Sequence, residues 1–405
     1  MKRIYFDNNA TTPVEEEVMA AMLPFFTDNF GNPSSLHWAG REVKQVVDDA
    51  RAEVAALIGA RSDEIVFTGG GSEGDNLAII GSCEALRAGG RHIITTAVEH
   101  PAVLDTCRWC EKNGFRVTFL PVDRRGMINL RQLERAIDHD TILISVMWAN
   151  NETGTIFPIA EIGEIASRYG VRFHCDAVQA AGKLALDVNA AGVDLLTISG
   201  HKIGAPKGIG ALYVRRGLEL CPHIHGGHQE YGLRAGTHNV PGIVGLGVAC
   251  RLARTRLAED ADTLAALRDR LQQGITQRVE HVQVNGHPEQ RLPGTLNISV
   301  AFVEGEGLLL HLDMHGIAAS SGSACSSGSE GASHVLRAMG VKDDLLQSSI
   351  RFSLGRHNTA AEVDEVVAVF ADVVARLRAM SPMLMDFNGI ECDTYVECAI
   401  EEDHH

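Results

Sequence analysis

The feature that most constrains the fold of this chain is the alternation of short apolar runs with helical stretches over its first 250 residues. The runs cover residues 64–68, 92–96, 116–120, 142–148, 171–175, 194–199 and 210–214. Between several of them apolar residues recur every three to four positions, as from Val43 to Ile58. Such alternation builds a mainly parallel sheet covered by helices on both faces. We therefore predict an α/β fold with a mainly parallel seven-stranded sheet in a large domain, residues 15–260.

The character of the chain changes after about residue 250. A long helical pattern over residues 257–275 leads into a region with fewer strands, which ends in another helix preceded by a capping box of Thr359 and Glu362. This pattern predicts a smaller α+β domain, formed by residues 1–14 and 261–382. The acidic stretch 383–405 lacks periodicity and is predicted to be a mobile tail.

The charge of the chain excludes some partners. With 36 basic against 52 acidic residues, the net charge is −16, which repels both nucleic acid and anionic lipid. No stretch approaches the ~20 apolar residues of a membrane-spanning helix, and the N-terminal apolar run is too short for a signal peptide. The nine cysteines are an odd, scattered set that indicates free thiols. We expect a cytoplasmic protein that binds neither nucleic acid nor membrane.

Polar residues follow four of the predicted strands. They are His100, the group Asn150-Asn151-Glu152, Asp176, and the run Ser199-Gly200-His201-Lys202. In doubly wound sheets ligands bind outside the carboxyl ends of the strands, so these residues are expected at one rim. One such residue is more often structural, as a helix cap or a turn former. Four together predict a functional site.

A glycine-rich turn over residues 68–73, Thr-Gly-Gly-Gly-Ser-Glu, connects a predicted strand to a predicted helix. Amides at a helix N-terminus, with the Ser72 hydroxyl, can bind a phosphate, although a plain tight turn fits this stretch about as well. Pyridoxal phosphate would explain the turn together with the rim. A lysine forms a Schiff base with this cofactor, and a carboxylate keeps its ring nitrogen protonated. Lys202 and Asp176 are the candidates.

Several motifs then resemble the class V family of pyridoxal-phosphate enzymes. They lie at residues 7–13 (DNNATTP), 31–35 (GNPSS), 99–100 (EH), 150–154 (NNETG), 176–179 (DAVQ) and 199–202 (SGHK). Residues 321–326 (SGSACS) resemble the active-cysteine loop of cysteine desulfurases, and residues 147–154 and 318–325 are most similar to the NifS type associated with nitrogenase maturation. The similarity runs from about residue 4 to residue 382 and implies the type I fold of pyridoxal-phosphate transferases.

The resemblance also implies roles for individual residues. Lys202 would bind the cofactor covalently, Asp176 would pair with the ring nitrogen, Gln179 would hydrogen-bond the ring hydroxyl, and His100 would stack on the ring and shuttle protons. The phosphate would be held by Gly71, Ser72, Ser199, Gly200 and His201. Thr237 would reach the phosphate of a neighbouring subunit, which implies a homodimer.

The implied reaction converts L-cysteine to L-alanine through a persulfide on Cys325, with an iron–sulfur scaffold protein as the sulfur acceptor. Arg351 would clamp the substrate carboxylate, and Asn151 would lie near the substrate and the ring hydroxyl. The alternation over residues 350–354 independently places Arg351 opposite the apolar face, and a guanidinium binds a carboxylate with two parallel hydrogen bonds. From residue 320 to 333, 12 of 14 residues are Ser, Gly or Ala, so the loop that carries Cys325 is expected to be flexible.

Some features depart from this pattern or leave alternatives open. Ser72 stands where the family commonly has threonine, and His238 stands where it often has glutamate. We expect no metal site in the enzyme itself, except that Cys325 could share an iron–sulfur cluster transiently. Another class V enzyme, such as an aminotransferase or a selenocysteine lyase, would not require the cysteine loop. A sulfur-relay subunit that mainly binds a scaffold is the other alternative, and nitrogenase-specific and housekeeping roles both stay open.

Overall fold

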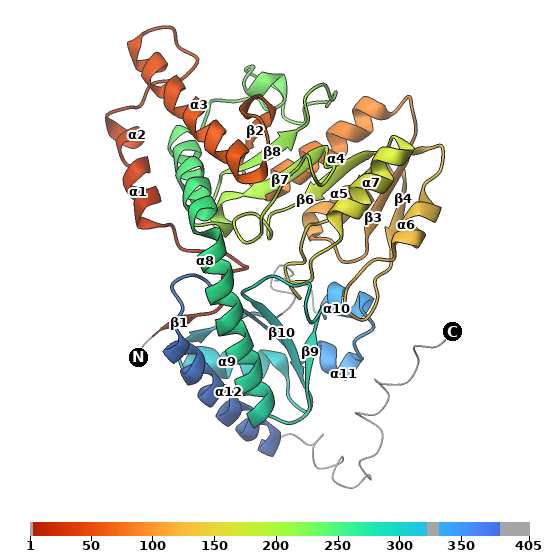
Figure 1. Ribbon diagram of the computed structural model, residues 1–405, viewed down its shortest axis with the longest axis vertical. Helices are drawn as coiled ribbons and strands as arrows, with labels where there is room; N and C mark the ends of the chain where they lie inside the picture. Colours follow the sequence, from red (N-terminus) through yellow and green to blue (C-terminus); the bar gives the residue numbers. More distant parts are fainter. Residues whose placement is uncertain (1–2, 322–331, 381–405) are drawn as a thin grey trace.

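The computed structural model describes residues 3–321 and 332–380, so the predicted tail and Cys325 lie outside the described residues (Figure 1). A seven-stranded sheet in the order β2-β8-β7-β6-β5-β3-β4 forms the centre of the larger part of the chain. Its strands are β2 (Ile65–Thr68), β3 (His92–Thr96), β4 (Arg116–Leu120), β5 (Thr141–Ser145), β6 (Arg172–Asp176), β7 (Leu195–Ser199) and β8 (Gly210–Val214). Only β8 runs antiparallel to its neighbours, which confirms the predicted mainly parallel sheet.

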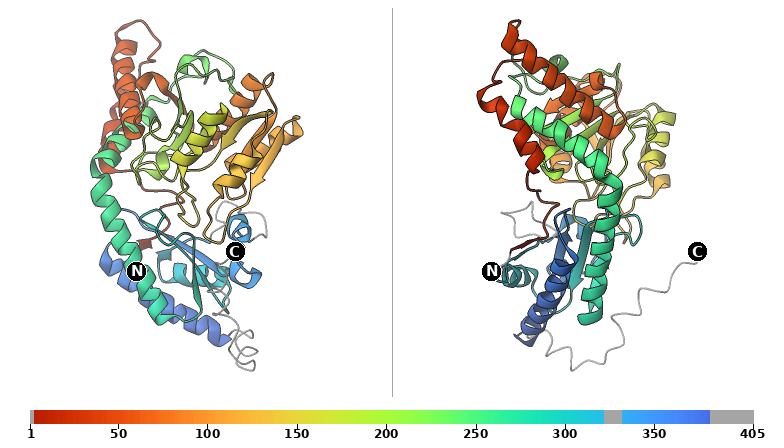
Figure 2. Two further views of the ribbon diagram at one scale, coloured as in Figure 1. Left: turned by 45° about the vertical axis from the view of Figure 1, so that its right-hand side comes forward. Right: turned by 60° about the vertical axis from the view of Figure 1, so that its left-hand side comes forward.

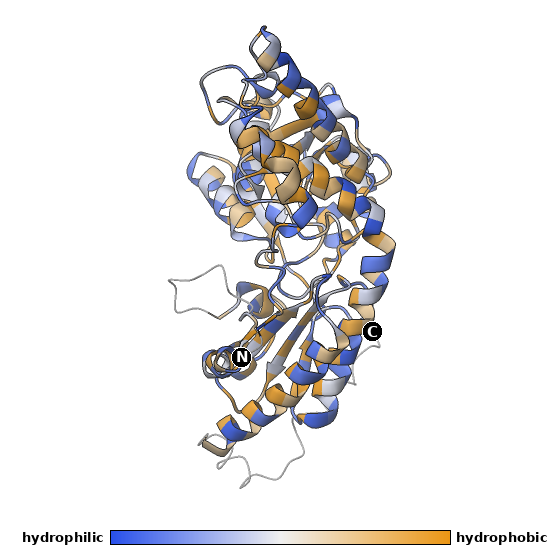
Figure 3. Ribbon diagram, turned by 90° about the vertical axis from the view of Figure 1, so that its left-hand side faces the viewer, coloured by the Kyte–Doolittle hydropathy of each residue, from blue (hydrophilic) through white to orange (hydrophobic). Residues whose placement is uncertain are grey.

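Both faces of this sheet are covered by helices, as its continuous apolar strands require. Successive strand residues join different core clusters: Ile93 and Leu143 belong to the cluster formed with α4 and α5, whereas Ile94 and Ile144 belong to the larger cluster that includes α7. The helices of this large body are α1 (Glu16–Met22), α2 (Pro24–Thr27), α3 (Trp38–Ile58), α4 (Gly71–Leu86), α5 (Pro101–Lys112), α6 (Leu130–Ala136) and α7 (Ile159–Tyr169). Figure 3 shows hydrophobic and hydrophilic residues along the same helices, as expected for helices that bury one side.

The small body has its own sheets and its own core. Three antiparallel strands lie in the order β12-β10-β9, and β1 pairs with β11 in a two-stranded parallel sheet. Its elements are β1 (Ile4–Tyr5), β9 (Val282–Asn285), β10 (Thr295–Val300), α9 (Gly305–Met314), β11 (Ile317–Ala318), β12 (Ser349–Ser353) and α12 (Ala360–Met380). The short helices α10 (His334–Ala338) and α11 (Asp343–Leu346) precede β12, but their buried residues join the core of the large body. The Thr359 hydroxyl accepts from the Glu362 amide and the Glu362 carboxylate accepts from the Thr359 amide, which confirms the predicted capping box.

Helix α8 (Val240–Arg278) links the two bodies (Figures 1 and 2). Its first half joins the core of the large body through Ile243 and Leu246, and its second half joins the core of the small body through Leu267 and Leu271. Where one domain ends along this helix stays a prediction. None of the helices in the described part of the chain is long and apolar enough to cross a membrane.

The N-terminal segment runs from the small body to the large body, whereas α8 runs from the large body to the small one. After β1, the Asn8 amide donates to the Ser353 carbonyl oxygen (3.0 Å) in the small body. Four residues later the Thr12 amide donates to the His201 carbonyl oxygen (2.9 Å) in the large body. Residues 8–12 therefore lie beside the carboxyl ends of β6 and β7, where the site is found.

Candidate active site

A cavity of about 350 Å³ lies at the carboxyl ends of the parallel strands. Its walls include residues from both bodies, with the N-terminal segment between them. The predicted site residues that line it are Gly71, Ser72, His100, Asn151, Asp176, Gln179, Ser199, His201, Lys202 and Arg351. The strand-end rule and the quoted motifs therefore identified residues that the fold does bring together.

The glycine turn forms part of the cavity wall at the start of α4. Gly70 precedes the helix with a φ of +147°, a conformation that side chains rarely allow. A Cβ atom on Gly71 would lie 2.9 Å from Val178 Cγ2, so the turn packs there because residue 71 has no side chain. Ser72, Ser199 and His201 line the hollow in front of the turn. Amides at the N-terminus of a helix attract an anion, so this hollow suits a phosphate group.

Lys202 ends the short helix η2 (Gly200–Lys202), which directly follows β7. Its Nζ donates to the carbonyl oxygens of Asn9 (2.6 Å) and Ala10 (2.8 Å). Burial, followed by the positive charge of Lys202, lowers the pKa of His201 to about 4. His201 is therefore a neutral ring at physiological pH, next to the Lys202 amine at this end of the cavity.

Asp176 is the last residue of β6 and is buried. Its Oδ1 accepts from the Val178 amide at 2.9 Å. Burial raises the pKa of Asp176 to about 6, against the lowering effects of this hydrogen bond and of Lys202. Burial and the charge of Asp176 raise the pKa of the neighbouring Asp75 well above its ordinary value. Asp176, for which the Val178 amide and Lys202 partly offset the effect of burial, is therefore the better candidate for a carboxylate that stabilises a cation in the cavity.

His100 begins α5 as its N-cap, and its Nδ1 accepts from the Ala102 amide at 3.1 Å. Burial, with the positive charges of Lys202 and of His334 when protonated, lowers the pKa of His100 to about 4. Since Nδ1 accepts a hydrogen bond, the single proton of the neutral ring is on Nε2. His100 is thus an uncharged, oriented ring in the cavity wall.

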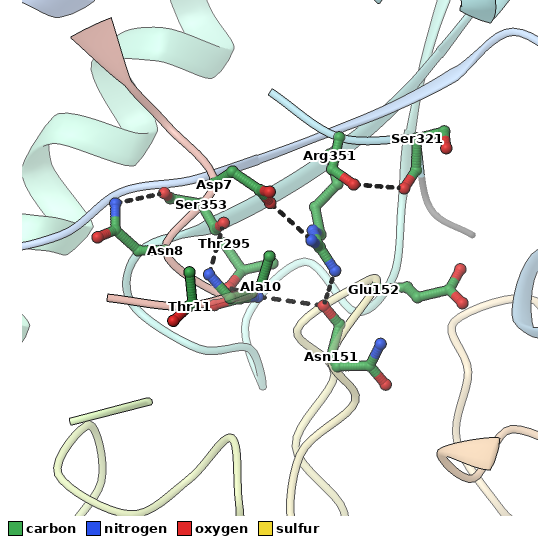
Figure 4. Close-up of polar contacts among 12 residues, drawn as sticks. Asp7, Asn8, Ala10, Thr11, Asn151, Glu152, Thr295, Ser321, Arg351 and Ser353 are labelled. Atoms are coloured by element: carbon green, nitrogen blue, oxygen red, sulfur yellow. Dashed lines mark hydrogen bonds and ion pairs between the residues drawn. The ribbon is translucent and has the colours of Figure 1, made fainter. Parts of the chain in front are cut away.

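Arg351 lies on β12, between the core residues Ile350 and Phe352, and its side chain turns the other way (Figure 4). The guanidinium donates from Nη2 to Asp7 Oδ1 (2.7 Å) and from Nη1 to the Asn151 carbonyl oxygen (3.1 Å). The predicted alternation in this strand is confirmed. Asp7 supplies the counter-charge that a buried guanidinium needs, and Arg351 lines the cavity.

Other predicted residues lie away from the cavity. Gly200 is buried in η2, and Thr237 is exposed between η3 (Glu230–Gly232) and α8. The partner of His238 is now identified, since its Nε2 lies 2.6 Å from Glu230 Oε1. Glu230 also accepts two hydrogen bonds from the buried Arg51, so this group anchors the segment that presents Thr237.

Residues that the sequence reasoning missed also line the cavity. Asn9 belongs to a quoted motif but was given no role, and Asp75 lies on the buried side of α4. For Asn9 the motif itself was the available signal. For Asp75 the signal was a charged residue on an otherwise apolar helix face. Among the described residues no group of three or more His, Cys, Asp or Glu side chains could hold a metal ion.

The fold and this cavity define a class of protein. Its members are α/β proteins with a large and a small body, in which a lysine, an aspartate and a helix N-terminus meet at one rim of a parallel sheet. Residues 4–366 match the aminotransferase class-V family, and the chain belongs to this family. Membership implies a pyridoxal phosphate cofactor, and it confirms the resemblance found in the sequence.

The more particular likeness is to cysteine desulfurases. The chain is 53% identical to cysteine desulfurase 2 of Trichormus variabilis over 386 residues, covering 95% of this chain and 96% of that protein. It is 52% identical to cysteine desulfurase IscS of Methanosarcina thermophila, with 94% of each chain covered. Among solved structures, a NifS-like protein superposes with a TM-score of 0.88 at 39% identity, covering 93% of this chain and all of that one.

Proposed function

We propose that this protein is a pyridoxal-phosphate-dependent cysteine desulfurase, which converts L-cysteine to L-alanine and transfers the sulfur through Cys325 to an acceptor. The observation that carries the proposal is the single cavity in which Lys202, Asp176 and Arg351 converge from two bodies of the fold. The identity of about half of all residues with cysteine desulfurases, over nearly the whole chain, supports the same activity.

The residues present fit the cofactor. The hollow at the start of α4 suits its phosphate, with Gly71, Ser72, Ser199 and His201 as ligands. Asp176 is a buried carboxylate whose raised pKa a cationic ring nitrogen would bring back down. Lys202 would hold the cofactor covalently, and Gln179, with Asn151, would hydrogen-bond its ring hydroxyl. When bound, the cofactor withdraws electrons from the Cα atom of the substrate.

The side chains of this protein would then divide the reaction between them. Arg351 binds the carboxylate of cysteine and orients the substrate, and Lys202 removes the Cα proton and returns a proton later. The Cys325 thiolate attacks the substrate sulfur, so that an S–S bond forms as the substrate Cβ–S bond breaks. The electron pair of that bond stays on carbon and is protonated, which yields alanine. His100, neutral and oriented, would contact the ring and move protons.

The proposed activity also implies partners. The persulfide needs an acceptor, for which we propose an iron–sulfur scaffold protein, with Cys325 as a transient shared ligand. We further propose that the protein is cytoplasmic and forms a homodimer. The dimer would explain why Thr237 is exposed, anchored through the neighbouring His238, and absent from the wall of the cavity in its own subunit. The sulfur would serve iron–sulfur or nitrogenase cluster assembly, in keeping with the NifS-like motifs of the chain.

The first prediction concerns the covalent lysine. Protein incubated with pyridoxal phosphate should turn yellow, and borohydride should fix the cofactor onto one peptide, the one that contains Lys202. The reason is that Lys202 is the cavity lysine beside both Asp176 and the phosphate hollow. Peptide mapping by mass spectrometry makes the measurement. Labelling at another lysine, or no visible band, would contradict the proposed function.

A second prediction tests Arg351. Arg351→Lys keeps the charge near Asp7 but loses the planar fork that grips a carboxylate with two hydrogen bonds. We expect the KM for cysteine to rise by about 10- to 100-fold, the equivalent of one charged hydrogen bond, with a smaller change in kcat. Steady-state kinetics would show it. Arg270→Lys, which alters an exposed ion pair with Asp364, is the matched control. An unchanged KM would exclude Arg351 as the carboxylate ligand.

A further inference from the structure

Lys183 lies behind the cavity wall and has no part in the chemistry described so far. It follows Gln179 by four residues, in the segment after β6. Its Nζ donates to Gln179 Oε1 (2.9 Å) and to Asn9 Oδ1 (3.1 Å). Lys183 lines a second, smaller cavity of about 100 Å³, and Lys202 borders both cavities. Lys183 therefore reaches the active cavity only through Gln179 and Asn9.

These contacts fix which end of the Gln179 amide faces which partner. Gln179 Nε2 donates to the Asn9 carbonyl oxygen at 2.9 Å, and a carbonyl oxygen can only accept. Lys183 occupies the other end, where an amine with two oxygen neighbours must donate to both. The amide is therefore held at both ends, with one of the two Nε2 hydrogens left for the cavity.

Asn9 is itself held rigidly, so the arrangement does not depend on Gln179 alone. Its Nδ2 donates to Thr295 Oγ1 (2.9 Å) and to the Asn151 carbonyl oxygen (3.1 Å). Its backbone amide donates to Ser353 Oγ (2.9 Å), and its carbonyl oxygen accepts from Lys202. Thr295 begins β10 and Ser353 ends β12, both in the small body, and Figure 4 shows them near Ala10 and Asn151. Asn9 thus ties Gln179, Lys183 and Lys202 to the second body.

We propose that Lys183 is a positioning residue that, with Asn9, locks the Gln179 amide so that its NH2 group faces the bound cofactor. The cavity then presents a hydrogen-bond donor to the ring oxygen, which stabilises that oxygen as an anion. The inference rests on the proposed function, since it needs pyridoxal phosphate in the cavity. Burial and the charges of Lys202 and Arg351 lower the pKa of Lys183 to about 7, and in either protonation state its nitrogen keeps enough hydrogens for both bonds.

The test is a spectroscopic pH titration of the cofactor-loaded protein. In Lys183→Met the Gln179 amide loses one of its two anchors, and the donor to the ring oxygen weakens. Because the weakened donor stabilises the ring-oxygen anion less, we expect the pH midpoint of the change in the visible band to rise. The rise should be about one pH unit, since a hydrogen bond to a charged group is worth about that much. Lys44→Met, at an exposed position of α3, should leave the midpoint unmoved.

Three further variants test the positioning role, and the double variant separates it from a plain charge effect. Lys183→Arg keeps both donors and charge at this position, so its midpoint should lie close to that of the wild type. Gln179→Ala should raise the midpoint by itself, and adding Lys183→Met to it should add little, because Lys183 acts through Gln179. A full additional shift in the Gln179→Ala background would overturn the proposal, as would an unmoved midpoint in Lys183→Met.

The outcomes also distinguish this inference from the proposed function. A wild-type protein without a visible band would contradict cofactor binding itself. A normal wild-type band with no effect of Lys183→Met would overturn only the role of Lys183. Thermal melts of each variant verify folding. If Lys183→Met does not fold, Lys183→Gln, which can donate to one oxygen, takes its place with a smaller rise expected, and an unmoved midpoint there overturns the inference equally.

Discussion

Cys325→Ala is expected to reduce alanine formation from cysteine by about a thousandfold or more, because no thiolate remains to attack the substrate sulfur. The variant should still bind pyridoxal phosphate and still change its absorbance when cysteine is added, since Lys202, Asp176 and the phosphate hollow are untouched. Alanine release and visible spectra, recorded on the same samples, make the measurement. Loss of both signals together would instead indicate a damaged cofactor site.

The matched control for Cys325 is the pair of C-terminal cysteines. Cys392→Ala with Cys398→Ala should retain near-normal turnover, because acidic residues next to them in the sequence disfavour the reactive thiolate. Mass spectrometry of the wild type after brief exposure to cysteine should find one extra sulfur on the peptide that contains Cys325. Near-normal alanine production by Cys325→Ala would refute the assignment and turn attention to the two tail cysteines.

The product analysis also decides between this activity and the other class V chemistries. A selenocysteine lyase or an aminotransferase does not need Cys325, so its turnover would survive the substitution. Pull-down of an iron–sulfur scaffold by wild type and by Cys325→Ala alike, with no turnover in either, would favour a sulfur-relay subunit. Formation of alanine together with a Cys325 persulfide would support a cysteine desulfurase and none of these alternatives.

The strands of the central sheet were predictable because parallel strands are buried on both faces and so read as uninterrupted apolar runs. Strands β3, β4 and β8 begin and end where the runs do. Strand β5 ends at Ser145, whereas the run continues to Trp148. Val146 and Met147 are buried beyond the end of the strand, and the Val146 and Trp148 amides still donate to the carbonyl oxygens of His174 and Asp176 in β6. Hydrophobicity reports burial, and it cannot show where regular strand geometry stops.

Helix α8 shows the opposite limitation. The predicted helical pattern covers residues 257–275, yet the helix begins at Val240. Its first turns contain Gly242, Gly245 and Gly247, which weaken the helical signal in the sequence. Their small size serves packing, since a Cβ atom on Gly247 would lie 2.7 Å from Ala50 of α3. The close approach of α3 to α8 therefore requires residues that, read locally, argue against a helix.

The site was predictable where chemistry coincides with a strand end, and unpredictable where it depends on contacts across the chain. Lys202 and Asp176 each follow or end a strand, so position and residue type agree. The ion pair of Arg351 with Asp7 and the hydrogen bond of Gln179 to Asn9 join residues separated by 344 and 170 positions. No local pattern reports such pairs, because they form only when the N-terminal segment passes between the two bodies.

Asp176→Asn is expected to lower turnover by about a hundred- to ten-thousandfold, the cost of removing one partner from a buried charge pair. The substitution keeps the shape of the side chain, and the Asn oxygen can still accept from the Val178 amide. What disappears is the negative charge that stabilises a protonated ring nitrogen and so lets the cofactor accept electrons. The variant should remain yellow, since the phosphate hollow and Lys202 are unchanged, and should react slowly with cysteine in stopped-flow absorbance.

The control for this charge is the carboxyl group beside it. Burial and the charge of Asp176 raise the pKa of Asp75 well above its ordinary value, which favours its neutral form, so Asp75→Asn places a neutral group of similar size there. The loss of turnover there should be no more than about tenfold, the effect expected of one altered hydrogen bond. If Asp75→Asn abolishes turnover and Asp176→Asn does not, the ionised carboxylate of the cavity is Asp75, and the pairing of Asp176 with the cofactor is wrong.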